Sequence, residues 1–135
     1  MNYITVTPQF SVAPQIQPED IETIKSLGYQ AIINNRPDGE VPGQPTNAAI
    51  ESAAIAAGLA YHHLPITSGN LPMEAIEQTK QLINEIEGPT FAFCRSGTRS
   101  ITLWALSQKD QQPSDDILNA VQNAGYDLPF LAHYL

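Results

Sequence analysis

The sequence is poor in the residues that define several large classes of protein. One cysteine and three histidines occur among its 135 residues, and charged side chains make up 15%. A single cysteine cannot form an internal disulfide or a cysteine-rich metal site. No apolar run is long enough to cross a membrane, and the first residues lack the basic, apolar and small-residue order of a secretory signal. We therefore expect a cytoplasmic protein with neither a metal nor a cofactor.

Basic residues are also scarce. Six lysines and arginines stand against 14 acidic residues, for a net charge of −8. Such a surface repels nucleic acid and anionic membranes, so we expect neither as a partner. The arginines Arg36, Arg95 and Arg99 all lie in two loops, whereas the lysines lie in or beside expected helices. Guanidinium groups form charge-assisted hydrogen bonds with oxyanions, so this grouping predicts a site for a small anion.

The order of expected strands and helices predicts one α/β domain over residues 1–135. Strand patterns at residues 3–7, 10–12, 31–33, 60–64 and 90–93 alternate with helical patterns that begin near residues 18, 47, 72, 101 and 114. This alternation predicts a mainly parallel central sheet with helices on both faces. Asn47 and Ser114 are the expected helix caps, Met73 is expected to face inward, and Trp104 is expected in the core. The loops after residues 33, 64 and 93 should meet at the carboxyl edge of the sheet.

The stretch from residue 90 to residue 106 carries the strongest functional signal. An apolar strand ends at Cys94, a short polar loop follows, and a helical pattern begins after it. Such a loop turns its backbone N–H groups toward one point, to which the helix N-terminus and Arg99 add positive charge. This field would bind an oxyanion and stabilise a thiolate. We predict that Cys94 is a catalytic nucleophile and that Arg99 clamps the anion.

The neighbouring polar residues have supporting roles in this interpretation. The predicted anion-binding set is the rest of the loop, namely Arg95, Ser96, Gly97, Thr98 and Ser100. Ser100 either hydrogen-bonds the thiolate or only caps the helix. Asp38 and Glu40 follow Arg36, and each is either a general acid or an ion-pair partner of Arg36 or Arg99. His62 and His63 are adjacent in a strand and point to opposite faces, so they cannot bind one metal.

Three segments together carry a family resemblance. Residues 94–100, 35–40 and 103–106 resemble the phosphatase-like domain of the bacterial beta-lactamase-hydrolase-like proteins, and the similarity extends to about Ser107. The resemblance implies a compact fold similar to that of the dual-specificity (protein tyrosine) phosphatases. It also implies an enzyme, a hydrolase or a transferase, that works through a catalytic cysteine.

The sequence departs from that resemblance at three places. Cysteine phosphatases resemble one another in a His before the Cys and five residues between Cys and Arg, whereas Phe93 precedes Cys94 and four residues separate it from Arg99. This loop is similar to that of the rhodanese-type sulfurtransferases. Similar phosphatases place a general acid near the position of Ser68, which cannot protonate an alkoxide. Sulfite and thiolate leave without a proton, so the departures favour sulfur chemistry.

Three hypotheses follow. The first is a rhodanese-type sulfurtransferase that carries sulfane sulfur from thiosulfate or a low-molecular-weight persulfide as a Cys94 persulfide. The second is a cysteine-dependent phosphatase that hydrolyses phosphomonoesters through a cysteinyl-phosphate, with Asp38 or Glu40 as the acid. The third is a non-catalytic anion-binding or redox-sensing module in which Cys94 is the sensor.

Overall fold

A five-stranded sheet in the order β1-β2-β5-β3-β4 lies at the centre of the computed structural model, which describes residues 1–135. The strand β1 (Ile4–Thr7) pairs antiparallel with β2 (Phe10–Ala13). The other strands, β5 (Thr90–Phe93), β3 (Ala31–Asn34) and β4 (Ala60–His63), run parallel to β2. The prediction of a mainly parallel sheet is confirmed, and the antiparallel hairpin at one edge makes the sheet mixed.

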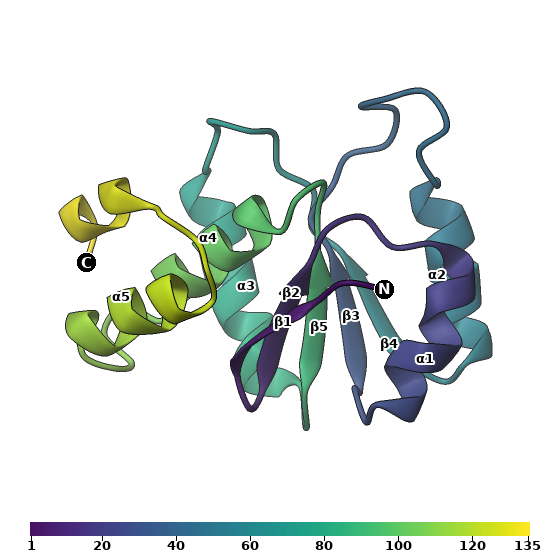
Figure 1. Ribbon diagram of the computed structural model, residues 1–135, viewed down its shortest axis with the longest axis horizontal. Helices are drawn as coiled ribbons and strands as arrows, with labels where there is room; N and C mark the ends of the chain where they lie inside the picture. The colour runs from purple at the N-terminus through teal and green to yellow at the C-terminus, as the bar shows by residue number, and fades with distance from the viewer.

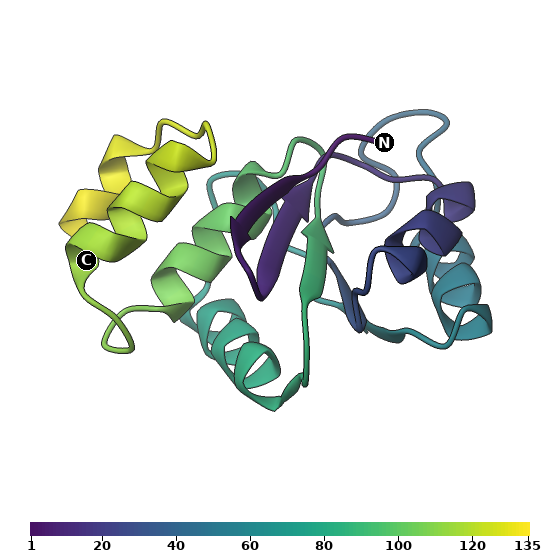
Figure 2. The same cartoon turned by 60° about the horizontal axis from the view of Figure 1, so that its bottom comes forward.

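Helices cover both faces of this sheet (Figure 1). One face carries α1 (Ile21–Ser26), which follows the 3₁₀ helix η1 (Pro18–Asp20), and α2 (Asn47–Ala56). The other face carries α3 (Met73–Glu85) and α4 (Thr98–Ser107). Figure 2 shows α5 (Ser114–Asn123) and the 3₁₀ helix η2 (Pro129–His133) beside α4 on its outer side. None of these helices combines the length and the hydropathy that a membrane crossing needs.

Two apolar cores form because successive residues of a strand point to opposite faces. Phe91 and Phe93 of β5 pack with Ile50 of α2, while Ala92 between them packs with Trp104 of α4. Central strands buried on both faces read as continuous apolar runs, which explains the pattern of β3 and β5 in the sequence. The core position predicted for Trp104 is confirmed by its 2% exposure and its stacking on Phe10, with ring centroids 6.2 Å apart.

The helix α4 is the most enclosed helix of the fold. Every residue from Arg99 to Ser107 is buried, because α3, α5 and η2 surround the face that the sheet does not cover. The helix starts at Thr98, directly after the loop of Cys94. The loop is therefore held between a buried strand and a buried helix, which makes its geometry rigid.

Three local predictions are wrong. Thr46 rather than Asn47 caps α2, since the Thr46 hydroxyl accepts the Ala49 N–H at 3.2 Å and Asn47 is already helical. Ser114 does not cap α5, because its hydroxyl donates to the Leu135 carbonyl at 2.8 Å. Met73 is 70% exposed, because it begins α3 and projects into a surface hollow rather than under the sheet.

The buried ring of Phe91 provides a test of the core. It has no exposed surface and meets Tyr29 edge to face, with centroids 5.2 Å apart. Phe91→Ala should lower the free energy of unfolding by about 3–5 kcal/mol in urea denaturation, because it leaves a cavity. Ile55→Ala, at a side chain that is 64% exposed, should change it by less than about 0.5 kcal/mol. Equal small losses in both variants would contradict this packing.

Candidate active site

The loops after β3, β4 and β5 meet at the carboxyl edge of the sheet, as predicted. Asn35 joins them: its backbone N–H donates to the Phe93 carbonyl at 2.9 Å, and its side-chain amide donates to the Leu64 carbonyl at 2.9 Å. The Asn35 carbonyl in turn accepts the Ile66 N–H at 3.2 Å. These hydrogen bonds pair polar backbone groups at the ends of three strands and hold the three loops at a fixed spacing. We call the edge that the three loops form the rim.

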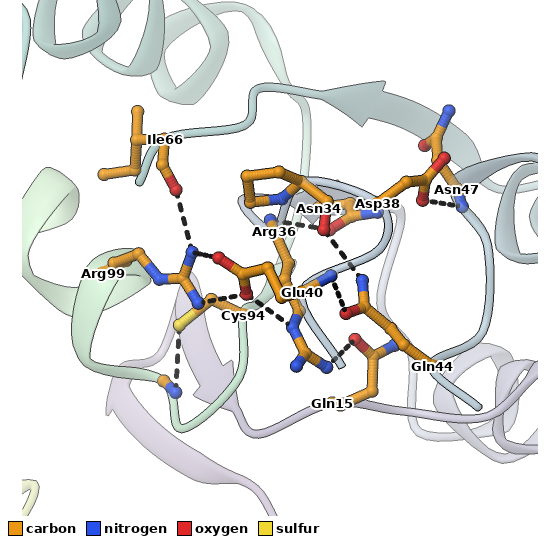
Figure 3. Close-up of polar contacts among 12 residues, drawn as sticks. Gln15, Asn34, Arg36, Asp38, Glu40, Gln44, Asn47, Ile66, Cys94 and Arg99 are labelled. Atoms are coloured by element: carbon orange, nitrogen blue, oxygen red, sulfur yellow. Dashed lines mark hydrogen bonds and ion pairs between the residues drawn. The ribbon is translucent and has the colours of Figure 1, made fainter. Parts of the chain in front are cut away.

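Cys94 lies at the floor of this rim. The residue is fully buried, and its backbone N–H donates to the Ala13 carbonyl at 3.3 Å. Its sulfur accepts the Gly97 N–H at 3.1 Å (Figure 3). Gly97 has a left-handed φ of 91° and stands at the N-cap of α4. The sulfur therefore lies at the positive end of α4, where it accepts an N–H group.

Tyr126 supports the loop from outside, a role that the sequence did not predict. Its hydroxyl donates to the Ser96 carbonyl at 2.9 Å. Burial, with the nearby Cys94, raises the pKa of Tyr126, so the hydroxyl stays protonated and can donate. The same oxygen lies so close to Gly97 that a side chain there would overlap it. Glycine is therefore required at position 97 for two reasons: its φ is left-handed, and a side chain would overlap the Tyr126 hydroxyl.

Glu40 bridges two of the three arginines (Figure 3). Arg99 donates from Nη1 to Glu40 Oε2 at 2.8 Å and from Nη2 to Oε1 at 2.9 Å, and Arg36 donates from Nε to Oε1 at 2.8 Å. A further Arg99 bond, from Nη1 to the Ile66 carbonyl, is 2.9 Å long. The hydrogen bonds from Arg99, together with those from Arg36 and both charges, lower the pKa of Glu40 to about 2 despite partial desolvation. Of the two roles predicted for Glu40, the structure therefore shows the ion-pair partner, and it pairs with both Arg36 and Arg99.

Arg99 and Arg36 are both buried, and Arg36 has a partner that the sequence did not predict. The Glu40 hydrogen bonds raise the pKa of Arg99, and its guanidinium group lies beside the Cys94 sulfur (Figure 3). Arg36 Nη1 donates to Gln15 Oε1 at 3.0 Å, and the Gln15 N–H donates to the Arg95 carbonyl at 3.3 Å. Gln15 follows β2, whose place beside β5 the sequence did not reveal.

The other predicted side chains have definite partners. The Asp38 carboxylate accepts the Asn47 N–H at 2.7 Å, so it turns toward α2 rather than toward Cys94. The Ser100 hydroxyl donates to Asn35 Oδ1 at 2.8 Å and makes no bond to the sulfur. His63 Nε2 donates to the Arg36 carbonyl at 3.0 Å. No group of three or more His, Cys, Asp or Glu side chains is arranged to hold a metal.

A cleft of about 440 Å³ opens above the loop of Cys94. Arg95 is exposed in it and takes part in no ion pair. Ser68 lies in the same cleft, as the sequence predicted. The lining contains no Asp, Glu or His, and consists of Thr67, Ser68, Gly69, Leu71, Arg95, Ser96, Thr98, Arg99, Thr102, Phe130 and Tyr134. The cleft can bind an anion, but it offers no carboxyl or imidazole group as a proton donor.

The strand, cysteine loop, buried helix and arginine place the chain in the phosphatase-like class of α/β proteins. A crystal structure of a candidate phosphatase from Neisseria meningitidis superimposes with a TM-score of 0.84 at 34% identity, covering 97% of this chain and 94% of that one. Kinase associated phosphatase gives a TM-score of 0.71 at 17% identity, over 85% of this chain and 74% of that one, which shows the fold alone. The fold prediction is confirmed.

The family follows from sequence comparison. The model of the beta-lactamase hydrolase-like protein, phosphatase-like domain, matches residues 2–111, and the chain belongs to this family. A beta-lactamase hydrolase-like protein of Agrobacterium fabrum is 35% identical over 130 residues, which are 95% of this chain. The chain spans 30% of the length of that relative. The predicted family resemblance is confirmed.

The low pKa of Glu40 makes stability depend on pH. Because this pKa falls from 4.5 to about 2 on folding, the ionised carboxylate stabilises the fold fully above 4.5 and progressively less as the pH falls toward 2. We expect Glu40→Gln to be less stable than the wild type near neutral pH. Its free energy of unfolding, from urea denaturation, should also fall less between about pH 5 and pH 2.

The control for this variant is Glu74→Gln. Glu74 is an exposed residue of α3 that takes part in no ion pair. Its substitution should leave the pH dependence of the wild type in place. A slope in Glu40→Gln as steep as that of the wild type would show that the bridge does not link stability to pH.

The contact between Gly97 and Tyr126 can be measured separately from backbone strain. Gly125 has the same φ of 91°, but a side chain there would meet nothing within 4 Å. Gly125→Ala should therefore cost about 1–2 kcal/mol of stability from the left-handed conformation alone. Gly97→Ala should cost at least about 1 kcal/mol more, because it also overpacks against the tyrosine hydroxyl.

A double-mutant cycle identifies that hydroxyl as the cause. Tyr126→Phe removes the oxygen that overlaps the new methyl group, so Gly97→Ala should be less destabilising in the Tyr126→Phe background by about 1 kcal/mol. Thermal or urea unfolding of the four proteins gives this coupling energy. Strict additivity would mean that the loop moves away from Tyr126 when the methyl group is added.

Proposed function

We propose that the protein is a sulfurtransferase of the rhodanese type, in which Cys94 carries one sulfane sulfur as a persulfide. The observation that carries the proposal is the absence of a carboxyl or imidazole proton donor among the residues that line the cleft. No carboxyl or imidazole side chain lines it, and Ser68 stands among its lining residues. Glu40 is held between two arginines with a pKa of about 2, and Asp38 turns toward α2.

This absence separates the two chemistries. A phosphomonoester leaves as an alkoxide that needs a proton from a general acid. Sulfur transfer needs none, because its leaving groups are sulfite and thiolate, which are stable as anions near neutral pH. The cleft therefore suits the departure of an anion that keeps its negative charge.

The steps of the proposed reaction balance without a proton. The Cys94 thiolate attacks the terminal sulfur of thiosulfate, and a bond forms between the two sulfur atoms. The sulfur–sulfur bond of thiosulfate breaks, and its electron pair leaves with sulfite. A thiolate acceptor then attacks the terminal sulfur of the Cys94 persulfide, takes that sulfur and releases the Cys94 thiolate.

The surrounding groups have defined parts in this proposal. The Gly97 N–H and the N-terminus of α4 stabilise the Cys94 thiolate and then the persulfide. Arg95, which is exposed in the cleft without an ion-pair partner, binds the oxygen atoms of the donor. Arg99 keeps its guanidinium group beside the sulfur, where Glu40 holds it in place.

A phosphatase is the second candidate, because phosphatases share the fold. In this alternative, Cys94 attacks phosphorus and forms a cysteinyl-phosphate. Without a general acid, only esters whose leaving groups are stable as anions, such as aryl phosphates, would react at a useful rate. The shared fold supports this alternative, but it does not supply the missing acid.

Intact-mass measurement tests the proposal. Incubation of the reduced protein with thiosulfate should add the mass of one sulfur atom, and cyanide or a thiol should remove it again. Cys94→Ser should show no adduct, and Arg95→Ala should form it more slowly, with a KM for thiosulfate raised by about tenfold for the lost charge-assisted bonds. Ser26→Ala, on α1 away from the cleft, is the control that should behave as the wild type.

A parallel assay with p-nitrophenyl phosphate separates the alternatives. Cys94-dependent hydrolysis of the ester with no sulfur adduct would overturn the proposal in favour of the phosphatase. Absence of both reactions in folded protein would overturn both enzymes and leave the anion-binding or redox-sensing module.

A further inference from the structure

One wall of the cleft is aromatic, and thiosulfate has no apolar group that could pack against it. Phe130 and Tyr134 line it from the segment that contains η2, next to Leu71. Phe130 is 38% exposed and Tyr134 is 58% exposed. Thiosulfate has no apolar surface, so it would leave both rings in contact with water. Exposed aromatic rings in a concave site are typical of a surface that binds a ligand.

The wall is already in place before a ligand arrives. The two rings meet edge to face, with centroids 6.4 Å apart. Leu131, between them in sequence, is fully buried in the core around α4, and the Ser114 hydroxyl holds the Leu135 carbonyl at 2.8 Å. A ligand would therefore lose little free energy in ordering these side chains.

The same cleft carries positive charge. Arg95 and Arg99 line it with the hydroxyl groups of Ser96 and Thr98. Elsewhere the surface is dominated by an excess of acidic residues, for a net charge of −8. A ligand that contacts both parts of the cleft must be an anion attached directly to an apolar, preferably flat, body.

Space for a larger body continues beyond the first ring. Leu71 and Tyr134 also line a second hollow of about 300 Å³, with Ile76 of α3 and Leu106 of α4 among its other lining residues. The two hollows therefore share an apolar boundary. Apolar surface that a ligand buries there would favour its binding.

We propose that Phe130, Tyr134 and Leu71 form an apolar subsite for the body of the sulfur donor. The preferred donor is then an organic anion with an aryl or similar apolar group next to the transferable sulfur, such as an aryl thiosulfonate. The inference rests on the proposed sulfur transfer. Phe130 and Tyr134 lie beyond residue 111, where the match to the family model ends.

The chemistry of this donor is the same as that of thiosulfate. The Cys94 thiolate attacks the terminal sulfur of the thiosulfonate, and a sulfur–sulfur bond forms. The bond between the terminal sulfur and the sulfonyl sulfur breaks, and its electron pair leaves with the aryl sulfinate. Sulfinate leaves as an anion, so no general acid is needed.

Two donors with the same reacting group test the subsite. Benzenethiosulfonate and methanethiosulfonate differ only in the body that the subsite would contact. We expect kcat/KM for the aryl donor to exceed that for the methyl donor by about tenfold or more. Phe130→Ala and Tyr134→Ala should each reduce this ratio by at least about threefold, because kcat/KM falls more for the aryl donor than for the methyl donor.

Two further variants serve as controls. Tyr134→Phe keeps the ring and should keep the ratio, which separates ring contact from the hydroxyl group. Ile55→Ala removes an exposed apolar side chain of α2, which lines neither hollow, and should also keep it. Equal kcat/KM for both donors, or a ratio that the alanine variants do not change, would overturn the subsite even if sulfur transfer is observed.

Calorimetric binding of benzenesulfonate and methanesulfonate needs no reaction, so it separates this inference from the proposed function. The wild type should bind the aryl anion more tightly, and Tyr134→Ala should reduce the difference. Aryl-selective binding without any sulfur transfer would support the subsite and reject the enzyme. Equal binding of both anions would reject the subsite whatever the enzyme does.

Discussion

The bridge that Glu40 makes between Arg36 and Arg99 holds the rim of the cleft in one arrangement. Both guanidinium groups are buried, and a buried charge without a partner is strongly destabilising. One carboxylate pairs with both, and it connects the loop after β3 to the start of α4. Arg99 also reaches the Ile66 carbonyl, so the loop after β4 is tied to the same point. The position of the thiol depends on this connection, because the short loop that begins at Cys94 leads directly into α4, which carries Arg99.

The bridge also divides the positive charge of the site. Arg36 and Arg99 share the Glu40 carboxylate inside the protein, whereas Arg95 faces the cleft without an ion-pair partner. An incoming anion is therefore attracted by Arg95, the backbone N–H groups and the start of α4 against an acidic background. The same arrangement removes the nearest carboxylate from proton transfer, because a group stabilised as an anion by two arginines is a poor acid catalyst.

The sequence predicted that strands and helices alternate, that three loops meet at the carboxyl edge of the sheet, and that a strand, the Cys94 loop and a helix follow one another. Each of these follows from the local pattern of residues. It could not choose between Asp38 and Glu40, which are two positions apart in a loop with no periodicity. Their opposite directions are set by α2 and by the buried arginines. Gln15 and Tyr126 could not be found either, since they reach the loop only after β2 has inserted beside β5 and α5 has packed on α4. The predicted cap of α2 was wrong by one residue for a similar reason. Thr46 and Asn47 are both good capping residues, and the tertiary contacts of Asn47 determine that Thr46 caps the helix.

Cys94 is the only cysteine in the chain, and it lies buried at the floor of the rim. A persulfide formed there has no second thiol in the same chain to expel its outer sulfur as a disulfide is made. In the proposed reaction, the chain therefore stores one sulfur atom per molecule and keeps it until an outside acceptor enters the cleft. The lifetime of the persulfide form would then depend on the concentration of that acceptor and not on a reaction within the chain.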